Sequence, residues 1–290
     1  MHRDLRQPRC NVADMRAIVA RSIAGSDPPA RTAAPEATRS WVLRHIVDPP
    51  LFWCGLALFG LSCLAWSLPA GLFNRLLPVR IRAPFGQFMI MAGFRCYLAV
   101  MQAVGLFRCD LRALDALGDE GALVIAPNHH SLLDAVLVIS RLPRVVCITK
   151  ASLWDNWFLG GGIRLASYIR NDSPVKLIKL ALTELRAGRQ LLIFPEGTRT
   201  VRPPINRFKP GFALMAQKAR VPVQTVFIES SSSYLSKGWS LFRRPRAPLI
   251  YRARLGRRFG VDGDVHEFVA ELEQYFRDEL SAGAADRTAA

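Results

Sequence analysis

The sequence predicts an α/β fold: a mostly parallel sheet flanked by helices, preceded by an N-terminal membrane-associated helical segment. Two observations predict it. From about residue 110, short apolar runs rich in β-branched residues alternate with amphipathic helical stretches, which is typical of a parallel sheet covered on both faces. Upstream, residues 51–73 contain no charged residue, and about 20 apolar residues are enough for a helix to cross a bilayer.

The chain begins with a segment that we expect to be disordered. Residues 1–40 are rich in Arg, Ala, Ser and Pro and have no sustained apolar face, so they form a leader or lie upstream of a true start at Met15. We therefore divide the chain into a disordered leader (1–40), a membrane-associated helical segment (41–107), an α/β domain (108–282) and a frayed, alanine-rich tail (283–290).

Two apolar stretches make up the membrane-associated segment. Residues 51–73 are expected to form a transmembrane or re-entrant helix that Pro69 can end early, the alternative being a buried core helix. Residues 85–107 carry Arg95 at their centre, and a charge in the middle of a bilayer is costly. We therefore expect an interfacial or re-entrant helix there rather than a second span.

The composition is basic, with 39 Lys and Arg against 23 Asp and Glu and a formal net charge of +16. Such a surface attracts polyanions: nucleic acids, anionic lipid headgroups or acidic carrier proteins. The basic residues follow the apolar segment, so the positive-inside rule places the α/β domain on the cytoplasmic side of a cell membrane, the inner membrane if the source is bacterial. The six cysteines are scattered without a CxxC pair, which argues against a zinc site or a disulfide framework.

The α/β domain contains clear local signals. A helix is predicted over 173–188, with Ser173 as N-cap, Pro174 in the first turn and Gly188 just past the end. Pro210-Gly211 opens another helix, and 264–280 is a further amphipathic helix. Buried strands are predicted at residues 123–126, 145–148, 191–194 and 221–228.

A polar cluster follows the first of these strands. His129 and Asp134 are five residues apart, in a turn that leads toward a helix at the carboxyl end of a buried strand, where open α/β sheets place their sites. A carboxylate bound to one imidazole nitrogen fixes the tautomer and leaves the other nitrogen free to accept a proton. No G-x-S-x-G elbow accompanies the pair. The cluster predicts a base that activates a substrate hydroxyl, with a simple capping pair as the alternative.

A second cluster follows the strand at 191–194, in the run Phe194-Pro195-Glu196-Gly197-Thr198-Arg199. Proline and glycine indicate a turn, and a threonine, an arginine and backbone N–H groups can face an anion. Lys209 comes directly before the helix that Pro210-Gly211 opens, and the N-terminus of a helix favours phosphate. The alternative is an ordinary polar turn.

Together the two clusters resemble two motifs of the glycerolipid acyltransferase family, in particular the 1-acylglycerol-3-phosphate acyltransferases. Asn128-His129-x-Ser131-x-x-Asp134 is similar to the family's first block and Phe194-Pro195-Glu196-Gly197-Thr198-Arg199 to its third. Tyr168-Ile169-Arg170 matches the second block imperfectly. Val221-Pro222-Val223 matches half of the fourth, with Thr225 where a proline is expected. The resemblance covers roughly residues 85–260 and implies the glycerolipid acyltransferase fold.

The resemblance also implies a reaction. A membrane-bound enzyme would transfer a fatty acyl group from acyl-carrier protein or acyl-CoA to the hydroxyl of lysophosphatidic acid, making phosphatidic acid without metal or further cofactor. His129 and Asp134 would be catalytic. The implied substrate-binding positions are Asn128, Ser131, Arg170, Glu196, Gly197, Thr198, Arg199 and Lys209.

Three alternatives stay open on the sequence. An enzyme of the same fold could act on another lysolipid, a glycolipid or a specialised metabolite, because Thr225 departs from the block associated with the acceptor. A nucleic-acid-binding protein would explain the charge, but the expected recognition helix or aromatic-interleaved basic strand is missing. A catalytically inactive membrane scaffold would have no need of the His129 and Asp134 pair.

Overall fold

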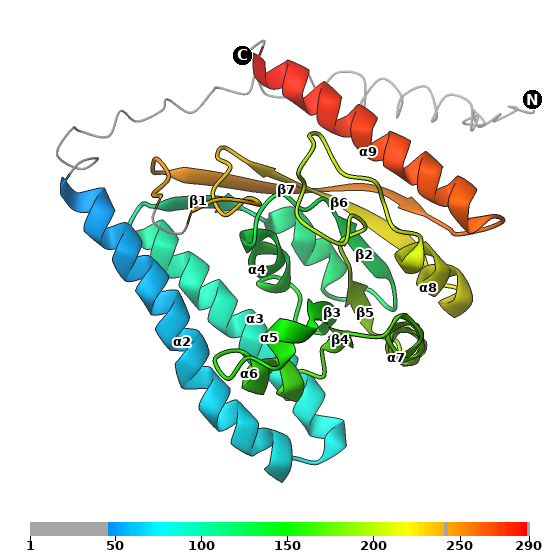
Figure 1. Cartoon of the computed structure of the whole chain (residues 1–290), viewed down its shortest axis with the longest axis horizontal. Helices are drawn as coiled ribbons and strands as arrows, with labels where there is room; N and C mark the ends of the chain where they lie inside the picture. Colours follow the sequence, from blue (N-terminus) through cyan, green and yellow to red (C-terminus); the bar gives the residue numbers. More distant parts are fainter. Residues whose placement is uncertain (1–45, 241–242, 289–290) are drawn as a thin grey trace, which may run out of the picture. The chain divides into compact units, whose positions relative to one another are not determined.

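A computed structural model describes residues 46–240 and 243–288 (Figure 1). The predicted leader, residues 1–40, lies outside the described residues. The described chain begins with two long helices and continues into an α/β domain built on one seven-stranded sheet.

The two long helices form an antiparallel hairpin. Helix α2 (Asp48–Leu76) and helix α3 (Val79–Ala103) are separated by Leu77 and Pro78. Rings meet along the hairpin: Phe59 lies 4.9 Å from Tyr97 and Phe73 lies 5.7 Å from Phe85, measured between centroids. The expectation that Pro69 can end the first helix early is wrong, because α2 continues past it for seven residues. An interior proline removes one backbone hydrogen bond, and packing against α3 compensates for that loss.

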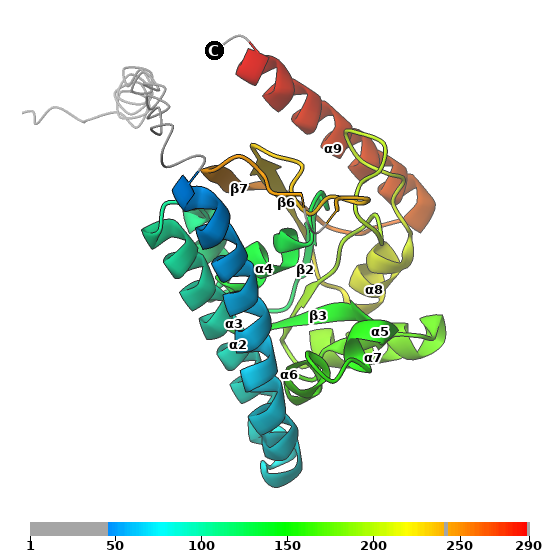
Figure 2. The same ribbon diagram turned by 60° about the vertical axis from the view of Figure 1, so that its left-hand side comes forward.

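Among the helices that the structure describes, α2 alone is long and apolar enough to cross a membrane. Only 17% of its most apolar stretch is buried, so α2 is not the core helix that the sequence left as an alternative. Leu61, Leu68 and Leu72 lie on one side of it and are more than half exposed. Figure 2 shows α2 and α3 side by side, with the α/β domain on one flank only.

The sheet is mixed but mostly parallel, with strand order β1-β7-β6-β2-β5-β3-β4. Of the strand pairs that the structure describes, only β6–β7 is antiparallel, and β2 lies between two parallel neighbours, β6 and β5. This architecture confirms the predicted fold class, and all four predicted strands are present. The strands are β1 (Phe107–Asp110), β2 (Val124–Pro127), β3 (Val145–Lys150), β4 (Ile169–Asn171), β5 (Gln190–Leu192), β6 (Val223–Ser230) and β7 (Leu249–Phe259).

Each face of the sheet has its own hydrophobic core, because successive strand residues point to opposite faces. Ile125 packs into the core beneath α2, α3 and α4 (Leu133–Ile139), whereas its neighbours Val124 and Ala126 pack beneath the helices on the other face. Those helices are α7 (Pro174–Arg186), α8 (Gly211–Ala219) and α9 (Val265–Thr288). The short elements η2 (Arg112–Leu117), α5 (Ala151–Trp154) and α6 (Gly160–Leu165) complete the domain.

The predicted helix boundaries are confirmed at α7 and α8 and corrected at α9. Ser173 is the N-cap residue of α7, although its side chain makes no capping hydrogen bond, and Gly188 follows the helix at φ +81°. Helix α9 continues to Thr288, so the helix predicted over 264–280 extends into the segment that was expected to be a frayed tail. The tail is rich in alanine, the strongest helix former, which carries the helix onward.

Helix α6 joins the hairpin to the α/β domain by close backbone contact. A Cβ atom on Gly161 would lie 2.0 Å from the Ser67 carbonyl oxygen of α2, and one on Gly86 of α3 would lie 2.6 Å from the Ala166 nitrogen. Gly161 N donates to Ser67 Oγ at 3.1 Å, and Ser67 Oγ donates to the Trp157 carbonyl at 3.0 Å. Only glycine permits this approach, which fixes the hairpin against the domain.

Candidate active site

The candidate site lies where β2 ends and the chain turns toward α4. Asn128, the first residue after β2, is fully buried. Its Nδ2 donates to the Ile228 carbonyl at 3.0 Å and its Oδ1 accepts from the Ile228 N–H at 2.7 Å. This double contact ties the end of β2 to the neighbouring strand β6. Asn128 therefore sets the exit of the chain from the sheet, and its amide is not available to a substrate.

His129 and Asp134 are brought together by this turn. His129 Nδ1 lies 3.0 Å from Asp134 Oδ2, and the same oxygen accepts from the Ser131 N–H at 2.7 Å. The histidine side chain is 15% exposed and the aspartate side chain 2%. An imidazole bound at Nδ1 by a buried carboxylate keeps Nε2 for a proton taken from elsewhere, which is the arrangement of a general base.

Ser131 stabilises the turn from inside. It is 2% exposed, and its Oγ donates to the Tyr234 carbonyl at 2.8 Å and accepts from the Leu133 N–H at 3.2 Å. These contacts hold the start of α4 against the loop that follows β6. Ser131, like Asn128, was predicted at a substrate-binding position, and the structure places it among the residues that support the His129 and Asp134 pair.

The second cluster packs directly on His129. The ring of Phe194 stacks on the imidazole with centroids 3.9 Å apart and an interplanar angle of 21°. The His129 N–H donates to Glu196 Oε1 at 3.0 Å, and the His129 carbonyl accepts from the Thr200 N–H at 2.5 Å. The loop after β5 thus holds both the ring and the peptide of His129. Phe194 was placed in this motif from the sequence, but neither Phe194 nor Thr200 was predicted to have a role at the site.

Glu196 is the centre of that loop. The residue is 2% exposed, and besides His129 its carboxylate accepts from Thr200 Oγ1 at 2.9 Å and from the Asn206 N–H at 2.8 Å. Asn206 in turn donates to the Arg199 carbonyl at 3.1 Å. A buried carboxylate with three donors inside the protein has little capacity left for a substrate. Glu196 therefore holds the backbone of His129 in position.

Gly197 and Lys209 lie together on the outer side of the loop. Gly197 is exposed at φ +66°, and a Cβ atom built on it would come within 3.0 Å of the Lys209 side chain, including Nζ. Lys209 is exposed, its N–H donates to the Pro195 carbonyl, and within the described residues its ammonium has no carboxylate partner. Thr198 is half-buried next to them. Lys209 is therefore well placed to meet an anion that approaches residues 197–198.

Arg199 is directed to the loop after β6. Its Nη1 donates to the carbonyls of Leu235 and Ser236 at 2.7 and 2.8 Å. Because guanidinium has five N–H donors, this contact occupies only one of its nitrogens. Arg199 connects the loops that follow β5 and β6 on either side of His129, and it keeps further donors for a ligand.

Arg170 lies at the edge strand β4 and has two carboxylate partners. Its Nη1 lies 2.6 Å from Asp155 Oδ1 and its Nε lies 2.8 Å from Asp172 Oδ2. The positive charge of Arg170 is therefore already balanced in this arrangement. No contact joins Arg170 to the cluster of His129 within the described residues.

Thr225, the departure from the family pattern, serves the sheet. It is fully buried, and its Oγ1 donates to the Arg257 carbonyl at 2.7 Å beside an irregularity in the β6–β7 pairing. Its side chain is thus directed to β7 and away from His129. Its hydroxyl therefore stabilises the β6–β7 pairing.

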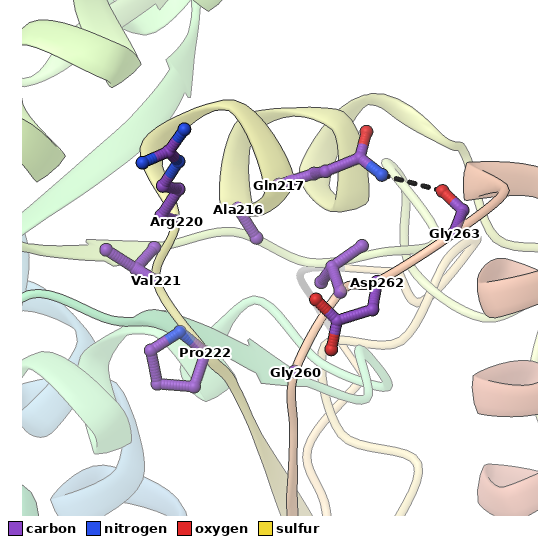
Figure 3. Close-up of a pocket in the computed structure, with 9 residues that line it drawn as sticks. Ala216, Gln217, Arg220, Val221, Pro222, Gly260, Asp262 and Gly263 are labelled. Atoms are coloured by element: carbon purple, nitrogen blue, oxygen red, sulfur yellow. Dashed lines mark hydrogen bonds between the residues drawn. The ribbon is translucent and has the colours of Figure 1, made fainter.

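A cavity of about 560 Å³ lies away from this site, near the amino ends of the parallel strands β2 and β6 (Figure 3). Pro222 precedes β6 and Gly260 follows β7, so both are near the start of β2, whereas His129 follows its end. The cavity is therefore separate from the candidate site. Among the described residues, no three His, Cys, Asp or Glu side chains are grouped as a metal site would require.

Comparison with known proteins identifies the family. A family model described as Acyltransferase matches residues 108–229, which include both clusters. A Caenorhabditis elegans protein named as a candidate 1-acyl-sn-glycerol-3-phosphate acyltransferase, acl-1, is 30% identical over 244 residues, 81% of this chain and 90% of that protein. The Pseudomonas aeruginosa 1-acyl-sn-glycerol-3-phosphate acyltransferase is 23% identical over 225 residues, 75% of this chain and 83% of that protein.

The fold is shared with a solved structure. The 1-acyl-sn-glycerophosphate acyltransferase PlsC from Thermotoga maritima superposes with a TM-score of 0.60 over 79% of this chain and 96% of its own, at 19% sequence identity. These matches agree with the geometry of the site, in which His129 and Asp134 are paired and a loop holds them in place. The chain belongs to the glycerolipid acyltransferase family and is an acyltransferase.

Proposed function

We propose that this acyltransferase transfers a fatty acyl group from a thioester of acyl-carrier protein or CoA to the free hydroxyl of lysophosphatidic acid, giving phosphatidic acid. The observation that carries the proposal is the His129 Nδ1 to Asp134 Oδ2 contact of 3.0 Å beside the loop 194–200. Two relatives that share most of their length with this chain bear the name of that activity, which supports the same acceptor here.

The residues suggest the following steps. His129 Nε2 takes the proton of the acceptor hydroxyl as its oxygen attacks the thioester carbonyl carbon. The tetrahedral intermediate collapses, the C–S bond breaks, and the imidazolium returns the proton to the departing sulfur. Asp134 fixes the ring and balances its transient positive charge, and Phe194 and Glu196 keep it in place. General-base assistance of this kind typically contributes about 10²–10⁴-fold.

The acceptor phosphate would bind on the outer side of the loop after β5. Lys209 supplies an ammonium beside Gly197 that has no carboxylate partner in the described part of the chain, and Arg199 keeps donors beyond its two backbone contacts. Arg170 is the weakest of the predicted phosphate ligands, since Asp155 and Asp172 already bind it. Its involvement would require that it exchange a carboxylate for the phosphate.

We further propose that the enzyme acts while bound to a cell membrane with its α/β domain on the cytoplasmic side. The exposed leucines of α2 support membrane association, and the basic composition supports the orientation. A site fixed to the bilayer suits an acceptor and a product that both carry a long acyl chain. The proposal includes no metal or further cofactor.

The experiment is thiol release from acyl-CoA and from acyl-carrier protein by membranes containing the full chain, with and without lysophosphatidic acid. We expect release that depends on the acceptor, yields phosphatidic acid and falls by about 10²–10⁴-fold in His129→Ala, with membrane association intact. Release without acceptor would indicate a thioesterase. Release only with another lysolipid or a glycolipid would move the proposal to that acceptor.

A further inference from the structure

The loop between β6 and β7 carries a concentration of positive charge. Between Glu196 and Asp262 the sequence contains a single acidic residue, Glu229. The loop itself, residues 231–248, contains Lys237, Arg243, Arg244 and Arg246 and no acidic residue. It leaves β6 at the same edge of the sheet as His129, because β6 and β2 are parallel.

Three of these charges are exposed and unpaired. Lys237, Arg243 and Arg246 have no carboxylate partner in the part of the chain that the structure describes. On the adjacent strand β7, Arg254 pairs with Glu279 and Arg258 pairs with Glu120. The three loop cations lack such acidic neighbours among the described residues, so their positive charge is available to an external anion.

An indole contacts one of the three cations. Trp239 is half-buried, its Nε1 donates to the Arg243 carbonyl at 2.8 Å, and the Arg243 guanidinium lies 4.6 Å from its ring centroid. Tryptophan and arginine in contact are characteristic of the membrane–water interface, where the indole sits at headgroup level and the cation meets phosphate. Lys237, Trp239, Arg243 and Arg246 are named here the basic loop surface.

Aromatic contacts join this surface to the first turns of α2. Trp239 packs edge-on against Tyr234 with centroids 5.9 Å apart, and Tyr234 packs against Phe52 of α2 at 5.3 Å. The neighbouring Trp53 is 36% exposed. Figure 2 shows the start of α2 beside the β6 and β7 end of the sheet. The basic loop surface therefore lies next to the beginning of the apolar helix α2.

We propose that the basic loop surface binds the anionic headgroups of the bilayer, as a second membrane contact next to α2. The inference rests on the membrane association in the proposed function and adds lipid selectivity to it. An acidic carrier protein is the other polyanion that fits the charge. The indole and its contact with α2 favour lipid, because a headgroup layer around the start of α2 reaches the loop directly.

The test is the partition of the full chain between two vesicle populations, one of phosphatidylcholine and one that also contains phosphatidylglycerol, separated by density. The triple variant Lys237→Gln, Arg243→Gln, Arg246→Gln should lose about 10²-fold in preference for the anionic vesicles, at roughly fivefold per residue near an anionic surface. The preference of the unmodified protein should also disappear near ~1 M salt, where the Debye length is about 3 Å.

The matched control is Lys179→Gln, Arg186→Gln, Lys218→Gln, which removes the same charge from α7 and α8 on the opposite face of the sheet. It should keep the anionic preference, and both triples should keep acyl-CoA turnover in neutral micelles. An equal loss in the two triples, or no loss in the first, overturns the proposal. So does a loop variant with unchanged lipid preference but a raised KM for acyl-carrier protein alone, which assigns the surface to that carrier.

The unmodified protein separates this inference from the membrane association on which it rests. Binding to neutral vesicles without a preference for anionic ones refutes the contact between the basic loop surface and anionic headgroups. It remains consistent with membrane association through α2. Absence of binding to both vesicle populations contradicts the membrane association itself.

Discussion

The position of His129 should depend on Glu196, a residue that does not contact the imidazole. Glutamine at 196 keeps one carbonyl oxygen and replaces the other by an NH₂ donor. In the structure, the two oxygens accept from the N–H groups of His129 and Asn206 and from the Thr200 hydroxyl. Whichever way the amide is placed, its NH₂ group faces a backbone N–H at about the distance of a hydrogen bond.

The magnitude follows from those contacts. A hydrogen bond to a charged group contributes about 1.5–3 kcal/mol, and a buried donor left without an acceptor costs roughly 1–3 kcal/mol. Because Glu196 is 2% exposed, water cannot restore the loss, and we expect Glu196→Gln to lower the free energy of unfolding by about 3 kcal/mol. A base displaced by a fraction of an ångström to one ångström should lower kcat by about 10²-fold.

The assay combines denaturant unfolding with acceptor-dependent thiol release, measured where the variant is fully folded. Glu271→Gln, the same exchange at an exposed position of α9, is the control and should change neither quantity. The reasoning requires kcat to fall while the acceptor KM stays close to its normal value. A variant with normal kcat and a raised acceptor KM would refute it and return Glu196 to the phosphate site.

Three further substitutions test the support of the site. Phe194→Leu should lower kcat by roughly two- to tenfold in the thiol-release assay, since an aromatic pair such as its stack on His129 is worth about 0.5–1.5 kcal/mol; an unchanged kcat would show that the stack is incidental. Lys209→Ala should raise the acceptor KM with little effect on kcat, because the phosphate would be gripped equally in ground and transition states. A fall in kcat alone would contradict that role. Asn128→Ala should lower the free energy of unfolding by roughly 2–4 kcal/mol in denaturant titrations, since it leaves the N–H and carbonyl of Ile228 unpaired in the core; a change below that range would mean that the ends of β2 and β6 are held by other contacts.

Local patterns predicted much of the fold. The run at 123–126 is apolar on both faces, as expected of a central strand. The two ends of α7 could be predicted from Ser173, Pro174 and Gly188. Strand β7 was missed although it is the longest. It contains four arginines, so its sequence resembles a charged surface segment, and the carboxylates that pair with Arg254 and Arg258 come from distant parts of the chain.

The candidate site was also predicted only in part. The His129 and Asp134 contact spans five residues and could be predicted from spacing. Glu196 and Asn128 were predicted at substrate-binding positions, yet their partners are 67 and 100 residues away. Such partners are set by the strand order, which places β6 and β5 on either side of β2. A motif marks which residues matter, and the order of strands decides what they touch.

The glycine contacts between α6 and the hairpin have a consequence for substrate choice. Backbone packs directly on backbone at Gly161 and Gly86, which restrains movement of the domain relative to its helices. If α2 is held in a bilayer as proposed, the height of His129 above the lipid is then set by the protein. The enzyme would then select acceptors by how deep their hydroxyl lies in the bilayer. A hydroxyl at the depth of the imidazole would reach it by lateral diffusion alone, and a hydroxyl that lies deeper or shallower would not.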